Sequence, residues 1–343
     1  MAKIKIKLEE LNRNSIEMLT REGVSQEDAE IVIQCIQEAE FYGVESHGYM
    51  RLSSYVDRLK KRLINPVPNI SMEKMGDSIL KVDGDGGLGQ VVTQKALERC
   101  MEEAQEHGVC IAAIANSNHF GTCGYFGRIA ARKGFIAFIT SNAAASMPPF
   151  GGMDNLLGTN PFAVSFPAGK YDNFTLDIAL TTVARGKIRI YDKMNKEIPI
   201  GWAMDAQGRD TTSAREALEG GLLPMGGHKG YGMAMAVDML CGVLSGAKLS
   251  HEIESMFKTT RPAELGHFIA IIDLSKLIDM NMFTKRVEEW FDTIKGAKLR
   301  EGYQEVLIPG ELENGKRQAE TDYIEILDKT LESILGRDFV KPD

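Results

Sequence analysis

The sequence predicts an α/β protein. Apolar residues recur at helical spacing through residues 8–62, whereas a strand, a helix and a second strand follow one another between Ser78 and Ala115. Further strand-like runs, separated by turns rich in glycine, asparagine and proline, continue to about residue 180. A chain of 343 residues, 43% of them hydrophobic, is also long enough to form two domains.

The N-terminal segment is predicted to consist of helices. Periodicity predicts one helix over Leu8–Arg21, and Ser25–Asp28 has the pattern of a capping box that begins a second helix reaching about Tyr42. Ser46 is a suitable N-cap for a third helix, which is expected to run to about Arg62.

The remaining elements are predicted from apolar runs and their spacing. The expected strands are Ser78–Asp83, Val109–Ala115, Phe135–Thr140, Ala163–Pro167, Phe174–Ile178, Lys187–Tyr191 and His267–Asp273. The expected helices are Gln90–His107, Met233–Leu244, Met282–Ile294 and Tyr323–Leu335. Because Asn160 precedes a proline, its backbone is expected to be extended.

Charge and composition exclude several classes of protein. A net charge of −8 without a basic stripe argues against a nucleic-acid partner. The apolar run Tyr231–Ala247 contains Asp238, and the N-terminus has no apolar signal core, so neither a membrane span nor secretion is expected. The five cysteines are scattered and lack CxxC spacing, which predicts reduced thiols in a cytoplasmic protein and no metal site.

Two glycine-rich segments are candidate phosphate-binding turns. Gly84–Gly89 satisfies GxGxxG between a strand and a helix, but the next strand ends in Asn116–Asn118, without an acidic residue for the ribose hydroxyls. The alternative there is a turn that lets helix and strand pack closely. Pro224–Gly232 places glycines and Lys229 at a helix N-terminus, which suits either an anion or a packing turn.

Two histidines and an arginine are the candidate catalytic groups. Reduction of a 2-oxo acid needs a cation for the carboxylate and a proton donor for the oxygen, and Arg51 and His47 lie four residues apart. Such a pair is also typical of a solvated helix face. His119 lies between small residues at the end of a predicted strand, where a functional and a structural role are both open.

Six motifs in order closely resemble those of the type 2 malate/L-lactate dehydrogenases: ESHGYMR, NSNHFG, LLGTNPF, GWAMD, PMGGHKGYG and PGE. The resemblance spans about residues 10–315 and implies an NAD(P)-dependent oxidoreductase of small 2-hydroxy and 2-oxo acids, typically a homodimer. It implies a non-Rossmann fold with a central mixed β-sheet nucleotide-binding domain (residues 76–229). A helical domain built from both chain ends (residues 1–75 and about 230–343) would complete it, and Gly84–Gly89 would then not bind the cofactor.

The resemblance also assigns roles to residues. His47 resembles the proton donor, His119 a second active-site histidine that some members use as the acid/base, and Arg51 the carboxylate clamp. Thr159 would line the substrate pocket. The positions resembling cofactor contacts are Ser141, Asn142, Asp177, Ile178, Ala179, His228, Lys229, Gly310 and Glu311. The implied cofactor is NAD, with NADP as the alternative.

The chain departs from the family pattern near these positions. Leu180 and Thr181 stand where Thr and Ser are common, Ser213-Ala214 where Asp-Pro is common, His228 where Tyr is frequent and Leu312 where Pro is frequent. The identity of the substrate and the fine cofactor contacts therefore stay open. Alternative functions are reduction of a cyclic imino acid, a ureidoglycolate or a diketo sugar acid, or cofactor binding without catalysis.

Overall fold

A seven-stranded mixed sheet forms the centre of the computed structural model, which describes residues 3–316 and 322–336. In spatial order its strands are β2 (Ser71–Gly76), β3 (Ile79–Asp83), β4 (Val109–Ser117), β10 (Leu265–Asp273), β5 (Phe135–Ser141), β6 (Phe162–Pro167) and β7 (Asn173–Ile178). β10 runs antiparallel to both of its neighbours, β4 and β5, so the sheet is not the parallel sheet of a Rossmann fold. The predicted α/β class with a mixed, non-Rossmann sheet is confirmed.

The directions of the strands collect several chain segments at one edge. β3 is parallel to β4. β4, β5 and β7 also share a direction, because one antiparallel strand separates each from the next. The carboxyl ends of all four strands therefore meet at the same edge, and the segments that follow them carry most of the candidate site residues.

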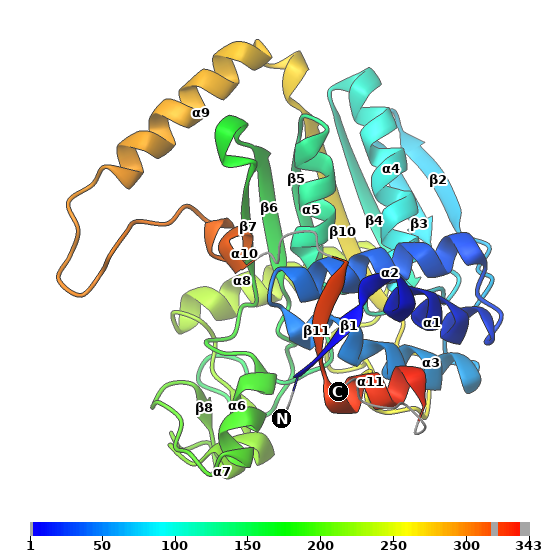
Figure 1. Cartoon of the computed structure of the whole chain (residues 1–343), viewed down its shortest axis with the longest axis vertical. Coiled ribbons are helices and arrows are strands. Elements are labelled where there is room, and N and C mark those ends of the chain that lie inside the picture. The colour runs from blue at the N-terminus through cyan, green and yellow to red at the C-terminus, as the bar shows by residue number, and fades with distance from the viewer. Residues whose placement is uncertain (1–2, 317–321, 337–343) are drawn as a thin grey trace.

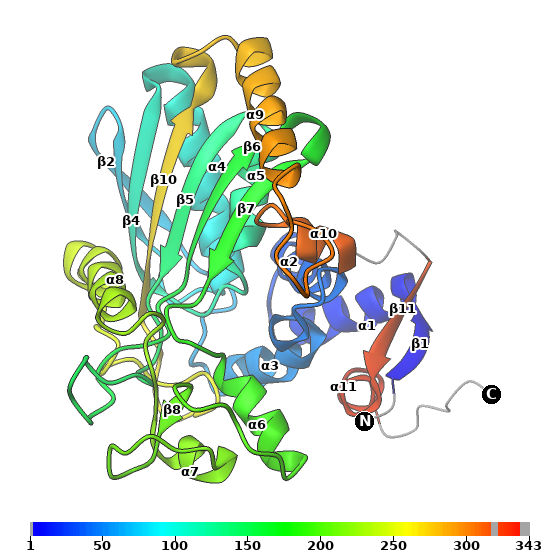
Figure 2. The same cartoon turned by 90° about the vertical axis from the view of Figure 1, so that its left-hand side faces the viewer.

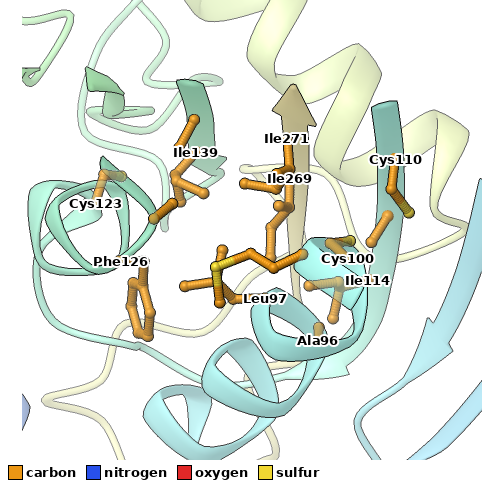
Figure 3. Close-up of a cluster of buried hydrophobic side chains, with 14 of the residues drawn as sticks. Ala96, Leu97, Cys100, Cys110, Ile114, Cys123, Phe126, Ile139, Ile269 and Ile271 are labelled. Carbon is orange, nitrogen blue, oxygen red and sulfur yellow. The ribbon is translucent and has the colours of Figure 1, made fainter. Parts of the chain in front are cut away.

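Helices cover both faces of the sheet. α4 (Gly89–His107) and α5 (Cys123–Arg132) pack on one face, where Leu97 and Phe126 join Ile139 and Ile269 in a buried apolar cluster (Figure 3). α8 (His228–Asp238) lies on the opposite face (Figure 2) and continues into the π-helix η4 (Met239–Leu244). No helix among the described residues is long and apolar enough to cross a membrane.

A helical part is built from both ends of the chain (Figure 1). It contains α1 (Leu8–Thr20), α2 (Gln26–Phe41), α3 (Leu52–Lys60) and α11 (Asp328–Leu335), and the side chain of Ser25 caps α2 by accepting the Asp28 N–H at 3.1 Å. β1 (Lys3–Lys7) pairs antiparallel with β11 (Tyr323–Leu327) and so joins the two ends. β10 belongs to the large sheet although it follows the predicted boundary near residue 230, and the division into two domains stays a prediction.

The other elements lie around this body. α6 (Arg185–Lys193), α7 (Ala214–Glu219), β8 (Ala203–Met204) and β9 (Gly221–Leu222) form a small lobe with its own apolar cluster. α9 (Met280–Lys295) extends outside the sheet, and a long loop leads from it to α10 (Glu311–Lys316) (Figure 1). Short 3-10 turns occur at η3 (Gly169–Tyr171) and η5 (Leu274–Lys276).

One predicted helix is wrong at its start. The chain from Ser46 to Arg51 does not enter a continuous helix but forms two 3-10 turns, η1 (Glu45–His47) and η2 (Tyr49–Arg51), before α3 begins. Gly48 between them is extended, with φ −85° and ψ −153°. The Glu40 carboxylate accepts the Tyr49 N–H at 3.2 Å and occupies the space that a side chain at residue 48 would need. This tertiary contact replaces the helical hydrogen bonds.

Three further local predictions are also wrong. Residues 187–191 belong to the helix α6 and not to a strand, because a short apolar alternation fits either element. Residues 323–327 form β11 and not the start of a helix, since Ile324 and Ile326 alternate toward the core and the strand pairs with β1. The backbone of Asn160 has φ +38° and is not extended.

Candidate active site

His47 and Arg51 lie in the two 3-10 turns that follow α2 in the chain. Nε of Arg51 donates to the backbone oxygen of Ser46, which ties the second 3-10 turn to the first. The Ser46 hydroxyl lies 3.0 Å from Nδ1 of His47, so this contact occupies one ring nitrogen and leaves Nε2 for a ligand. The two candidate residues therefore lie in two linked 3-10 turns and not on one helix face.

His119 follows the carboxyl end of β4 and reaches the same place. Its ring stacks on that of His47, with centroids 5.4 Å apart and planes 17° from parallel. The Gly121 N–H donates to Nδ1 of His119 at 3.3 Å, and the Tyr55 hydroxyl lies 2.7 Å from the same nitrogen. Because Nδ1 accepts a hydrogen bond, a neutral His119 carries its hydrogen on Nε2. The structure thus brings together residues that are 72 positions apart in the printed sequence.

The electrostatic setting keeps both rings neutral in the free protein. Burial lowers the pKa of His47 to about 4, and the Arg51 cation contributes. Burial also lowers the pKa of His119 well below its usual value, with smaller effects from His47, Arg51 and His267. An anion bound beside them would favour the protonated form and raise both pKa values. The site can therefore take up a proton together with an anionic ligand.

His267 was missed by sequence reasoning. It lies fully buried near the start of β10, where Nδ1 is 2.8 Å from the Ser141 hydroxyl and Nε2 is 2.8 Å from the Ser117 hydroxyl. Burial lowers its pKa to about 3. The ring thereby links the carboxyl ends of β4 and β5. It also contacts the ring of Phe120, the residue that follows His119. Its sequence signal is a single histidine in the apolar strand Leu265–Asp273.

Thr159 and Asn160 form the loop that leads into β6. The Thr159 backbone oxygen accepts the Leu180 N–H at 2.8 Å, and the side chain is half-buried. The buried amide of Asn160 accepts from Ala143 N–H and Ser250 Oγ, each at 3.1 Å, and donates to the α8 backbone oxygen of Ala234 at 2.9 Å. These three bonds hold Asn160 in its left-handed conformation despite the following proline.

The predicted cofactor positions Ser141 and Asn142 end β5. Their side chains already have protein partners: Ser141 contacts His267, and the Asn142 amide donates to Lys248 O at 2.7 Å and accepts from Gly266 N–H at 3.1 Å. Both residues are buried. They shape the edge of the sheet, where their backbone N–H groups donate to Pro161 O and Gly266 O, each at 3.3 Å.

Asp177, Ile178 and Ala179 end β7 at the same edge. The Asp177 carboxylate accepts the Gly124 N–H at the start of α5 at 2.8 Å. Ile178 packs in the apolar cluster that contains Met225 and other residues around α8. Three predicted cofactor positions thus lie between the beginnings of two helices.

His228 and Lys229 begin α8, and both side chains are exposed. Gly226 and Gly227 precede them with φ +64° and +65°, and a Cβ added to Gly230 would lie 2.2 Å from the Met225 backbone oxygen. The glycines therefore make a tight turn at the start of the helix, whose first N–H groups have no acceptor within the helix. Such groups beside a lysine fit the pyrophosphate of a dinucleotide.

Gly310 and Glu311 are neighbours in the chain but contact different parts of the structure. Gly310 packs against Thr175 of β7, whose N–H donates to the preceding Pro309 oxygen at 3.1 Å. The Glu311 carboxylate instead receives Nζ of Lys295 at 2.7 and 2.8 Å and the Ile308 N–H at 2.7 Å. Gly310 lies beside the strand that carries Asp177, whereas the carboxylate of Glu311 serves an internal ion pair.

The glycine-rich turn Gly84–Gly89 is packed against the chain before His119. A Cβ at Gly84 would lie 2.9 Å from Asn116 O, and one at Gly89 would lie 2.0 Å from Asn118 O. The Asn118 amide donates to the oxygens of Gly86 and Gly87, both at 2.9 Å. These contacts agree with the packing role, and the turn supports the segment that carries His119.

A possible cation site elsewhere is occupied by other interactions. Among the residues that the structure describes, Glu103, Glu106 and His107 on α4 are close enough together to bind one metal ion. Glu103 is already paired with Lys74 at 2.8 Å and with Arg99. The group is most simply a network of ion pairs far from the two stacked histidines.

Comparisons with known proteins agree with the geometry. A family model described as malate/L-lactate dehydrogenase matches residues 6–335. The L-sulfolactate dehydrogenase of Methanocaldococcus jannaschii is 38% identical over 92% of this chain and 91% of its own. The malate dehydrogenase of Pyrococcus horikoshii is 36% identical over 86% of this chain and 84% of its own. A structure of the Methanocaldococcus jannaschii sulfolactate dehydrogenase superposes with a TM-score of 0.91 at 36% identity, over 96% of this chain and 95% of that one.

Proposed function

The chain belongs to the malate/L-lactate dehydrogenase family, and we infer that it is an NAD(P)-dependent oxidoreductase that interconverts a small 2-hydroxy acid and its 2-oxo acid. The observation that carries this function is the stacked pair of His47 and His119 next to the Arg51 cation. The pair offers proton donors and the cation offers a partner for a carboxylate.

The residues of the chain divide the work of the reaction. Arg51 holds the carboxylate through the guanidinium N–H groups that Ser46 does not use. His47 donates a proton to the oxygen on C2 during reduction and accepts it during oxidation. Nε2–H of His119 polarises the same oxygen, since Nδ1 is held by Gly121 and Tyr55. A bound nicotinamide supplies hydride to C2 or takes it from C2.

Binding of the substrate prepares the acid. The free site keeps His47 and His119 neutral at neutral pH because burial and the Arg51 cation disfavour a further positive charge. The substrate carboxylate offsets the charge of Arg51 and so raises the pKa of both rings. The proton that reduction consumes is therefore taken up with the acid substrate.

The cofactor is assigned to the sheet edge between β5, β7 and α8. The first N–H groups of α8 and Lys229 would hold the pyrophosphate. The backbone at Ser141–Asn142, Asp177–Ala179 and Gly310 would line the rest of the site. NAD is the proposed cofactor and NADP its alternative.

The protein is proposed to be a homodimer. α8 and η4 together leave five large apolar side chains 41–58% exposed: Met233, Met235, Met239, Val243 and Leu244. A second copy placed against this face would bury it. Sedimentation analysis should give a dimer that the charge substitution Met239→Lys weakens, and a monomer at micromolar concentration would contradict the proposal.

The five unpaired, buried cysteines support a cytoplasmic location, which fluorescence of a tagged chain in cells would test.

The direct test is a panel of acids with both reduced cofactors. Oxaloacetate, pyruvate and a cyclic imino acid are each mixed with enzyme and NADH or NADPH, and loss of nicotinamide absorbance is followed. Turnover of a 2-oxo acid supports the proposed function. Turnover of the imino acid alone would assign an imine reductase, and cofactor binding without turnover would assign a non-catalytic protein.

A further inference from the structure

Two arginines share one aromatic ring beside the stacked histidines. The guanidinium carbon of Arg51 lies 4.9 Å from the ring centre of Phe257, and that of Arg189 lies 5.2 Å from the same centre. The two residues come from different parts of the fold, because Arg189 belongs to α6 of the small lobe. Phe257 itself is 55% exposed and Arg189 is exposed, whereas Arg51 is half-buried.

Neither cation has a carboxylate partner among the residues that the structure describes. Arg51 reaches the Ser46 oxygen and the sulfur of Met256 at 3.4 Å, and Arg189 makes only its ring contact. Partial burial lowers the pKa of Arg51, and the nearby Arg189 lowers it further. Two neighbouring unpaired cations in a chain with a net charge of −8 are a strong signal for an anionic ligand.

Glu254, three residues before Phe257 in the sequence, is paired with other groups. Glu254 accepts the Thr260 N–H at 2.8 Å and the Thr260 hydroxyl at 2.6 Å, and it lies 3.9 Å from Arg58. Arg58 donates to the backbone oxygens of Lys258 and Arg261 at 2.5 and 3.0 Å. These bonds hold the loop that carries Phe257. Glu254 is thereby used within the loop, and Arg51 and Arg189 stay available for a ligand.

We propose that Arg51 and Arg189 bind the two acid groups of a dianionic 2-hydroxy or 2-oxo acid, with the distal carboxylate or sulfonate on Arg189. This inference rests on the proposed function and names its substrate class. Arg51 lies close enough to His47 and His119 to lower the pKa of both, so it takes the carboxylate next to the reacting carbon. Arg189 contacts the same ring from α6 of the small lobe and meets the far end of the substrate.

The physical reason for selectivity is the second charge. A monoanionic acid would satisfy Arg51 and leave Arg189 without a partner, whereas a dianion satisfies both. A charge-assisted hydrogen bond contributes enough free energy to change affinity by about ten- to a hundredfold. Arg189 is therefore a specificity residue, and the small lobe supplies it.

The test compares oxaloacetate with 2-oxobutanoate, which has the same carbon chain and lacks the distal carboxylate. The native enzyme should prefer oxaloacetate in kcat/KM. Arg189→Gln should lower kcat/KM for oxaloacetate about ten- to a hundredfold, mainly through KM, and should change 2-oxobutanoate less than about threefold. Arg189→Lys should restore part of the loss. Lys187→Gln, on the same helix but with its ammonium group over the ring of Trp202, should leave both substrates unchanged.

A binding measurement separates this inference from the proposed function. Malate should raise the melting temperature of the native protein more than 2-hydroxybutanoate does, and Arg189→Gln should remove the difference. If the native protein turns over neither acid but retains this malate effect, the proposed function fails and the dianion site stands. Equal use of both acids by the native enzyme, or an equal effect of Arg189→Gln on both, would overturn the dianion site and leave the proposed function intact.

Discussion

The rings of His47 and His119 stack 5.4 Å apart, although His47 lies in η1 after α2 of the helical part and His119 follows β4 of the sheet. The proposed acid/base pair is therefore assembled only when the helical part docks on the sheet. The packed turn Gly84–Gly89 holds the His119 side of this contact, and Glu40 holds the His47 side.

Loss of either histidine should reduce the rate strongly. His47→Ala and His119→Ala should each lower kcat by about 10²–10⁴-fold, because each removes a group that donates to the reacting oxygen. Steady-state kinetics with saturating cofactor measure this effect. His107→Ala is the control, since that ring lies in the ion-pair network on α4. Near-normal kcat in both active-site variants would contradict the assignment.

Tyr55→Phe should affect the rate through His119. The substitution removes the hydroxyl that lies 2.7 Å from Nδ1 and leaves only the longer bond from the Gly121 N–H, at 3.3 Å, to hold the ring in its tautomer and orientation. We expect kcat to fall about tenfold with KM little changed, and the pH profile of kcat to shift.

Tyr49→Phe is the matched control for that substitution. Its hydroxyl donates to Asn12 in the helical part, so its loss should lower stability without moving the pH profile. A shifted pH profile of kcat in Tyr49→Phe, or an unshifted one in Tyr55→Phe, would contradict the role of Tyr55 in positioning His119.

His267 should make the protein sensitive to acid. Its pKa is about 3 in the folded protein and 6.5 as the ordinary value, so below that value the unfolded chain binds more protons and stability falls as pH falls. Between pH 6.5 and about 5 this group alone costs about 2 kcal/mol. Urea unfolding across this range should show a shallower pH dependence for His267→Gln, and an unchanged slope would exclude the effect.

Glu40 should act in the opposite direction. Burial raises its pKa to about 7 from 4.5, so the folded protein binds more protons and its stability falls as pH rises through this window. Glu40→Gln keeps an acceptor for the Tyr49 N–H and removes the charge. Its stability relative to the native protein should therefore increase from pH 5 to pH 8. A constant difference across that range would contradict the shifted pKa.

Lys229 should contribute to cofactor affinity. Lys229→Gln should raise KM for the nicotinamide cofactor about two- to tenfold, with kcat at saturation unchanged, because in the proposed site the lysine binds the phosphates and not the reacting atoms. Lys133→Gln, at the amino end of β5 and thus at the other edge of the sheet, is the control. Equal KM values for the cofactor in Lys229→Gln and Lys133→Gln would contradict binding of the pyrophosphate at the start of α8.

Local signals were sufficient where short-range interactions decide the structure. Ser25 begins α2 because its side chain caps the helix, and the central strands formed because their apolar residues alternate or run continuously. The shape of the turn at Gly48 depends on Glu40, and β11 depends on its partner β1. Such contacts join residues that no local pattern connects.

The same limit applies to the site. His47, Arg51 and His119 could be proposed from residue type and resemblance, but their meeting depends on how two parts of the fold dock. His267 and Arg189 carry no motif of their own, and each acquires its role from a neighbour in space: Ser117 and Ser141 for His267, and Phe257 for Arg189.

The most direct test follows the hydride itself. Enzyme, a 2-oxo acid and NADH or NADPH carrying deuterium at the transferred C4 position are incubated, and the product is examined by mass spectrometry and NMR. The account predicts a 2-hydroxy acid with deuterium bonded to C2, and no such product from His47→Ala with His119→Ala. A native enzyme that transfers deuterium to no 2-oxo acid with either cofactor would contradict it.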